Sequence, residues 1–169
     1  PTMFQVANII GDTLKEVIKT QKMTGPESEA DYGATMIVGG QIAGIGPRLF
    51  LIYPEGNFIE ASEETPFFQI GETKYGRPIL LRAYDPDMSF EEAIKLLYVS
   101  FDSTLKANLS VGMPLDLQVV EKGTMRVRHN RRIDEDDPYF QTVSSSWGDA
   151  LKLAFKSLPD FSFDKEDEA

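Results

Sequence analysis

The chain contains no cysteine and a single histidine, His129. The absence of cysteine excludes a disulfide framework and a thiolate metal site, and one histidine excludes a multi-histidine metal site. No apolar run in the sequence approaches the ~18 residues that a membrane-spanning helix needs. The first residues also lack the basic stretch of a signal peptide. We therefore expect a cytoplasmic protein that uses no metal or other cofactor.

Basic residues are scarce, since 17 Lys and Arg stand against 27 Asp and Glu, giving a net charge of −10. Such a charge repels nucleic acid and anionic membranes, so neither is an expected partner. Four arginines do cluster, and the acidic residues 134–137 follow them directly: Arg126, Arg128, Arg131 and Arg132. One interpretation is local charge balance on a solvated hairpin, and the other is a patch of ion pairs between subunits.

The length of 169 residues suits one domain, and 41% hydrophobic residues are enough for a core. The first element is a predicted helix whose apolar residues recur at steps of three and four: Met3, Val6, Ile10, Leu14 and Val17. No cap is expected before this helix, which favours a chain that originally extended further. The polar stretch 21–33 contains Gly25-Pro26 and predicts a loop.

Three predicted strands follow, at residues 35–38, 47–52 and 57–61. The turn between the second and third contains Pro54, which fixes φ early, and Gly56, which accepts a positive φ late. Strands this short with tight connections predict an antiparallel meander.

Two helices are predicted next, the first at residues 74–83. The second begins at Ser89, with Glu92 completing a capping box, and ends near Asn108. We expect its buried face to carry the apolar residues at helical spacing: Phe90, Ala93, Leu97, Phe101 and Leu105.

A predicted hairpin follows, with strands at 115–120 and 124–128 and a turn at Gly123. Asp137-Pro138 predicts the start of a last helix, whose buried stripe is Phe140, Val143, Trp147, Leu151 and Ala154. Residues 1–159 are thus predicted to form one domain and 160–169 an acidic, disordered tail. The order of elements predicts an α+β fold with helices layered on antiparallel sheets.

Several motifs in this order resemble the proteasome β-type subunits, and most closely the bacterial proteasome-related subunits of the Anbu kind. They are Val38-Gly39-Gly40, Gly46-Pro47-Arg48-Leu49-Phe50, Tyr53-Pro54-Glu55-Gly56-Asn57, Phe68 to Ile79, Phe101-Asp102-Ser103-Thr104, Asn108 to Leu117 and Asp136 to Phe140. The resemblance runs from about Met3 to Trp147. In the second turn, Tyr53 stands where the family usually has an acid.

The resemblance implies a four-layer αββα sandwich of the N-terminal nucleophile (Ntn) hydrolase type. It also implies a threonine peptidase that assembles into a ring or spiral homo-oligomer and cleaves peptides or unfolded proteins. In that family the first residue is a threonine whose hydroxyl attacks the peptide bond while its own amine acts as base. An aspartate and a lysine from the first strands support it. The chain is expected to be the C-terminal part, without those strands, and neither Pro1 nor Thr2 fits the nucleophile.

Two supporting catalytic residues are carried over from the family. Thr73 matches a serine in the strand-to-helix turn, although it could equally cap the following helix. Ser110 matches a serine in the loop after the long helix, where Ala107 replaces the family's aspartate. The neighbouring Asn108 is interpreted mainly as a helix C-terminal residue in the left-handed conformation.

Other functions are also considered. The alternative to the peptidase is a non-catalytic structural subunit that only builds the particle, and a third possibility is a small-molecule-binding α/β module. A carboxylate dyad of Asp102 and Asp116 and a phosphate loop at Gly39-Gly40 are both disfavoured, because neither has the required spacing.

Overall fold

The computed structural model of the protein describes residues 1–24 and 33–163. The first helix, α1, spans Met3–Thr24, so the expected loop at 21–33 begins later, and residues 25–32 lie outside the described residues. The expectation of an uncapped helix is wrong. The Gln5 backbone N–H donates to the Thr2 hydroxyl at 3.2 Å, and the Thr2 N–H donates to the Gln5 side chain at 2.8 Å. This reciprocal pair is a capping box, and the sequence Thr-x-x-Gln already contained it.

The predicted meander is confirmed as a three-stranded antiparallel sheet of β1 (Met36–Gly40), β2 (Arg48–Ile52) and β3 (Phe58–Glu60). At the turn between β2 and β3, Gly56 has φ +87°, and its N–H donates to the Tyr53 carbonyl at 2.9 Å. The positive φ is the conformation that glycine tolerates best.

The α1 helix packs on this sheet through buried residues: Met3 and Ala7 of α1 contact the cluster that contains Phe50 and Ile52 of β2. The approach is close at Gly11, where an added Cβ would lie 2.2 Å from the Gly56 carbonyl oxygen. Val17 was expected in the buried stripe but is 51% exposed, while Ile18 is buried. At α-helical spacing the contact face drifts around the helix, so over four turns the buried position has moved by one residue.

Helices α2 (Arg77–Ala83) and α3 (Phe90–Ala107) follow, and the capping box of α3 is confirmed. The Glu92 N–H donates to the Ser89 hydroxyl at 3.2 Å, and the Ser89 N–H donates to the Glu92 carboxylate at 3.0 Å. The expected buried stripe of α3 is wrong in part, because Phe90, Leu97 and Phe101 are 38–42% exposed. Tyr98 and Val99 are buried instead.

The predicted hairpin is a two-stranded antiparallel sheet of β4 (Leu115–Val120) and β5 (Val127–Ile133). The last helix, α4 (Pro138–Lys156), begins as predicted at Asp137, whose carboxylate accepts from the Phe140 N–H at 2.9 Å. Its first half is anchored by the buried Phe140 and Val143, whereas Leu151 is 49% exposed and therefore outside the core. Residues 160–163 have no regular secondary structure, and 164–169 lie outside the described part of the chain.

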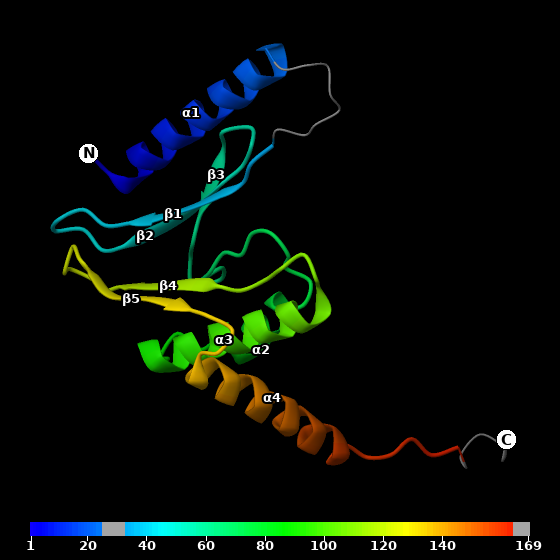
Figure 1. Cartoon of the computed structure of the whole chain (residues 1–169). Coiled ribbons are helices and arrows are strands. Elements are labelled where there is room, and N and C mark those ends of the chain that lie inside the picture. Colours follow the sequence, from blue (N-terminus) through cyan, green and yellow to red (C-terminus); the bar gives the residue numbers. More distant parts are fainter. Residues whose placement is uncertain (25–32, 164–169) are drawn as a thin grey trace, which may run out of the picture.

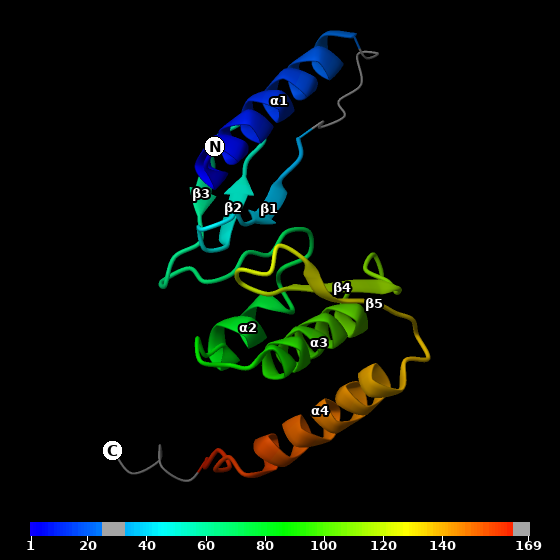
Figure 2. The ribbon, with the colours of Figure 1, turned by 90° about the vertical axis from the view of Figure 1, so that its left-hand side faces the viewer.

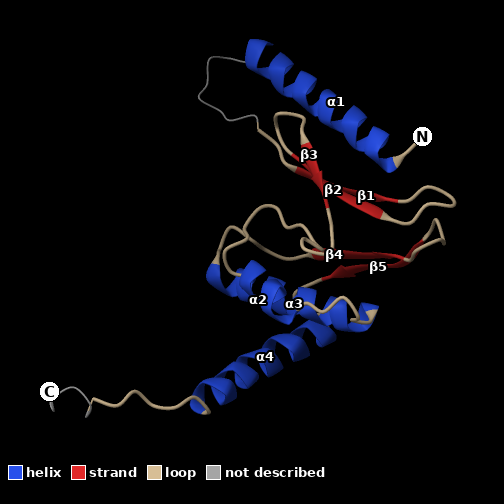
Figure 3. Ribbon diagram, turned by 180° about the vertical axis from the view of Figure 1, so that it is seen from behind, coloured by secondary structure: helices blue, strands red, loops and turns tan. Residues whose placement is uncertain are grey.

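The elements stack in layers (Figure 1). The α1 helix covers one side of the first sheet, the second sheet lies on the other side, and α2 and α3 lie beyond it, with α4 outermost. Figures 2 and 3 show the same order from the side and from behind. The predicted α+β class and αββα order are confirmed. The sheets are linked at Gln41, whose amide donates to the Glu121 carbonyl at 3.0 Å and accepts from the Gly123 N–H at 2.8 Å.

Candidate functional site

The first part of the candidate site is the turn that leads into α2. Gly71 has φ +78°, which lets the chain reverse, and Glu72 and Thr73 follow it, both half-buried. The Thr73 carbonyl accepts from the Arg77 N–H at 3.1 Å. The N-cap of α2 is Gly76, with no side-chain hydrogen bond, so the interpretation of Thr73 as the helix cap is wrong.

The turn is pressed against α3 at Gly76. An added Cβ there would lie 2.3 Å from the Ser100 hydroxyl and 3.0 Å from the Thr104 hydroxyl, both of buried residues. Glycine is therefore required at this position by lack of space rather than by backbone conformation, since Gly76 has φ −87°.

The second part of the site is the loop after α3. Asn108 closes this helix, but with φ −135° and ψ 111° it is extended, so the expected left-handed conformation is wrong. Its side chain makes the important contacts. The Asn108 carbonyl oxygen accepts from the Ser110 N–H at 2.9 Å and from the Ser110 hydroxyl at 2.7 Å. This is the local hydrogen bonding that asparagine favours in turns.

A hydrogen bond joins the two parts: the Asn108 amide nitrogen donates to the Glu72 carboxylate at 2.7 Å. The second Glu72 oxygen accepts from the Lys74 N–H at 2.9 Å. The hydrogen bond from Lys74, followed by the one from Asn108, holds the pKa of Glu72 below its ordinary value, against the opposing effect of desolvation. Thr73 and Ser110 thus belong to two loops that one ionised carboxylate ties together.

The sequence did not predict a role for Glu72. The resemblance pointed instead to position 107, where the family has an aspartate and this chain has Ala107. A carboxylate is present at this end of α3, but the turn before α2 supplies it. The only sequence signals were the acid beside Thr73 and the Asn-x-Ser spacing of Asn108 and Ser110.

Thr2, which precedes the first helix, does not take part in this network. The Thr2 hydroxyl accepts the Gln5 N–H in the cap of α1. Asp102 pairs with Lys106 at 3.0 Å and Asp116 with Arg132 at 3.2 Å, so the two carboxylates do not form a dyad. Within the described residues, no cluster of three metal-ligating side chains occurs, and none of the helices has the length and apolarity to cross a membrane.

Two hollows share Ala61 and Pro66 of the segment that follows β3. One, of about 690 Å³, lies among Ala61, Pro66, Phe67, Leu81 and Tyr84. The other, of about 570 Å³, is lined by Gly39, Gly40, Gln41, Arg48 and Val120, among others. Neither is lined by Thr73 or Ser110, so neither hollow joins the candidate site.

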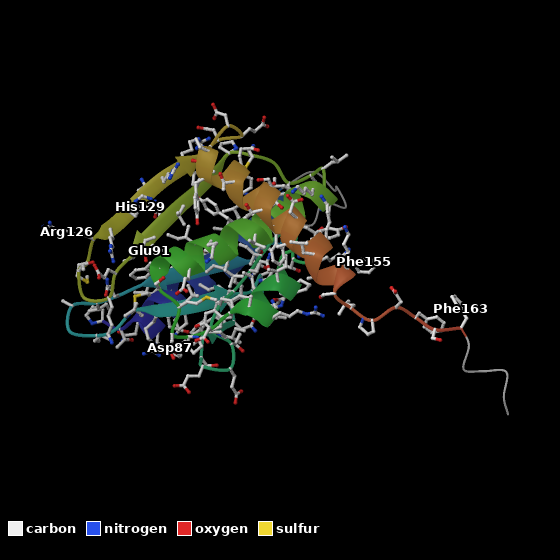
Figure 4. All side chains as sticks on the ribbon, turned by 90° about the horizontal axis from the view of Figure 1, so that it is seen from below. Asp87, Glu91, Arg126, His129, Phe155 and Phe163 are labelled. Carbon is white, nitrogen blue, oxygen red and sulfur yellow. The ribbon has the colours of Figure 1, made fainter. Side chains whose placement is uncertain are left out.

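The arginine cluster is largely balanced within the chain. Arg128 pairs with Glu121 at 3.5 Å, Arg131 with Asp137, and Arg132 with Asp116. Local charge balance, the first of the two interpretations, is confirmed for these three. The Arg128 guanidinium also lies 5.5 Å from the centre of the Phe90 ring. His129 lies in β5, and Arg126 directly precedes this strand (Figure 4).

Comparison with known proteins agrees with this architecture. The sequence pattern of the proteasome subunit family matches residues 13–120, and the chain therefore belongs to that family. It is also 30% identical over 103 residues to the proteasome subunit beta type-7 of Dictyostelium discoideum, a match that covers 60% of this chain and 37% of that protein.

The solved structures define the kind of subunit. Anbu from Hyphomicrobium sp. strain MC1 is 49% identical with a TM-score of 0.86, and Anbu from Yersinia bercovieri is 41% identical with a TM-score of 0.88. The Anbu chain in a helical assembly of the Anbu complex from Pseudomonas aeruginosa is 40% identical to this chain, again with a TM-score of 0.88. Each match covers 96% of this chain. The predicted resemblance to proteasome-related β-type subunits of the Anbu kind is confirmed.

The chain spans only part of these relatives. It covers 65% of the Hyphomicrobium protein and 67% of the Yersinia and Pseudomonas proteins. What a whole protein of this kind does is therefore a separate question from what this chain contains.

Proposed function

We propose that the chain belongs to a subunit of a self-compartmentalising, cytoplasmic threonine peptidase that hydrolyses peptides or unfolded proteins. The observation that supports it is the joining of the Thr73 turn and the Ser110 loop through Glu72 and Asn108. The linkage holds together the two hydroxyl-bearing segments that resemble those with which the family supports its nucleophile. The threonine nucleophile, with its aspartate and lysine, would come from outside this chain.

The roles of the chain's own residues are then limited. The attacking hydroxyl needs its proton removed by an adjacent base, and that base must be held in place by further polar groups. Thr73 and Ser110 are suited to this supporting work, because a hydroxyl oxygen can accept a hydrogen bond from an amine. Neither residue would attack the peptide carbonyl or become acylated.

The alternative function is that of a non-catalytic structural subunit, and the exposed apolar surface favours it. Phe155, Phe161 and Phe163 are 76–85% exposed at the end of α4 and beyond it. Figure 4 shows Phe155 near the end of α4 and Phe163 on the segment that extends away from the body of the molecule beyond it. Contiguous exposed apolar surface marks contacts between proteins. The Pseudomonas relative was solved as a helical assembly of the Anbu complex, which supports a role in assembly.

The two functions are separated by assaying the protein made from its complete reading frame against fluorogenic peptides. Turnover that a threonine-directed covalent inhibitor abolishes supports the peptidase. An assembled particle without turnover supports the structural subunit. The 169-residue chain alone should be inactive in the same assay, because the parts of a nucleophilic site act as a unit. Inhibitor-sensitive turnover by this chain would mean that its nucleophile lies among residues 1–169.

A further inference from the structure

The hydrogen bonds around Asn108 have a fixed direction. Glu72 is ionised and can only accept, so the amide group of Asn108 that faces it must be the NH₂ group. The Ser110 backbone N–H can only donate, so the group that faces Ser110 must be the carbonyl oxygen of Asn108. Both neighbours demand the same orientation, and the assignment of the amide is therefore unambiguous.

This orientation determines the state of the Ser110 hydroxyl. The Asn108 oxygen carries no hydrogen, so in the 2.7 Å contact the hydroxyl must be the donor. Its hydrogen is thereby directed at Asn108, and the lone pairs of its oxygen remain available. Because Ser110 is exposed, a group from outside the network can reach them. The hydroxyl thus presents an acceptor, not a donor, to whatever binds beside it.

The network is also anchored to the backbone of the turn before α2. One Glu72 oxygen is held by the Lys74 N–H at 2.9 Å, inside the turn that Gly76 fixes against α3. The other oxygen takes the Asn108 amide. The carboxylate therefore holds the Ser110 loop in place relative to the turn before α2. Asn108, through which it does so, is 36 residues after Glu72 in the chain.

We propose that Glu72 is a positioning residue of the candidate site: through Asn108 it fixes Ser110 as a hydrogen-bond acceptor for an N–H donor, such as a protonated amine, at the reacting centre. This inference rests on the proposed peptidase function for the identity of the reaction. The orientation of Ser110 itself does not depend on that function.

The first test follows hydrogen exchange of the Ser110 amide in the full chain by NMR. Glu72→Gln keeps the size of the side chain but can accept only one of the two N–H donors. We expect Ser110 exchange to rise about tenfold, which corresponds to one hydrogen bond to a charged group. Asn108→Ala should have at least the same effect. Glu63→Gln, an exposed acid of the preceding loop, is the matched control and should leave the Ser110 amide unchanged.

The second test measures peptide hydrolysis by the protein from its complete reading frame. Ser110→Ala and Glu72→Gln should each lower kcat about tenfold with little change in KM. If Glu72 acts through Ser110, the double variant should be no slower than Ser110→Ala alone. A role that is merely structural would instead make the two losses multiply and would appear equally in KM and in the melting temperature.

The possible outcomes are distinct. Unchanged Ser110 exchange in both Glu72→Gln and Asn108→Ala overturns the proposal, as do multiplying losses of kcat. If the wild-type protein assembles but has no turnover, the peptidase function fails. The exchange measurement then decides alone whether Glu72 positions Ser110.

Discussion

Gly76 lies directly against Ser100: an added Cβ at Gly76 would be 2.3 Å from the Ser100 hydroxyl and 3.0 Å from its carbonyl oxygen. The contact presses the start of α2 onto the middle of α3. It also fixes the turn from which Glu72 and Thr73 project. A position with no space for a methyl group is one of the most sensitive points of the fold.

Gly76→Ala should therefore destabilise the chain by about 1–3 kcal/mol, the range for overpacking a tightly packed site. The measurement is the midpoint of urea unfolding. Gly112→Ala is the matched control, because an added Cβ there meets nothing within 4 Å. An equal effect of the two substitutions would show that the cost comes from loss of glycine flexibility and not from the Ser100 contact.

Phe50 should contribute more to stability than any of the exposed phenylalanines near the end of the described chain. It is 0% exposed beneath α1, whereas Phe155 is 76% exposed. Phe50→Ala is expected to lose about 3–5 kcal/mol, since it removes buried surface and leaves a cavity. Phe155→Ala should change the unfolding free energy by less than about 0.5 kcal/mol at low protein concentration. Comparable losses for both would contradict the burial of Phe50.

The capping box of α3 predicts a dependence on pH. Hydrogen bonds from the Ser89 N–H and hydroxyl hold the pKa of Glu92 below its ordinary value. A lowered pKa in the folded state means that the carboxylate stabilises the fold above the pKa of the unfolded chain. That contribution is lost as the pH falls through the lower folded pKa.

The measurement compares the wild-type chain with Glu92→Gln across this acidic range. The stability difference between them should shrink as the pH falls. Ser89→Ala should lose about 1 kcal/mol at neutral pH, as is usual for an N-cap residue. A difference between wild type and Glu92→Gln that is constant with pH would show that the charge of Glu92 is not involved.

Association is predicted from the apolar segment beyond the middle of α4. We expect the 169-residue chain to scatter light increasingly with concentration and to bind a dye for apolar surface, because such surface drives association. Replacing Phe155, Phe161 and Phe163 by serine should reduce both signals without changing the urea midpoint measured on the monomer. A stable monomer of 18.9 kDa that binds no dye would contradict the prediction.

The sequence predicted elements wherever the signal was local. The capping pair Ser89 and Glu92, the turn at Gly56 and the start at Asp137-Pro138 each depend on residues within a few positions, and each is confirmed. The cap at Thr2 was equally local and was overlooked. Which apolar face is buried was harder to predict. Leu97 of α3 stays 38% exposed although it lies on the predicted apolar stripe, because periodicity does not reveal which neighbours cover a helix face.

The candidate site was predictable only in part. Thr73 and Ser110 were identified through the resemblance, but the bond from Asn108 to Glu72 spans 36 residues and arises from packing. Asparagine at a helix end suggests a left-handed cap. Here Asn108 has an extended backbone, and its side chain bonds to Glu72 and Ser110. Long-range pairing of polar side chains leaves no periodic trace in a sequence.

The two halves of α4 differ in how far they are buried. In the first half, up to Trp147, one face of the helix is buried through Phe140 and Val143. In the second half, Leu151, Leu153 and Phe155 remain 49–76% exposed. Substitutions in the second half are therefore expected to change the outer surface of the molecule while the domain continues to fold.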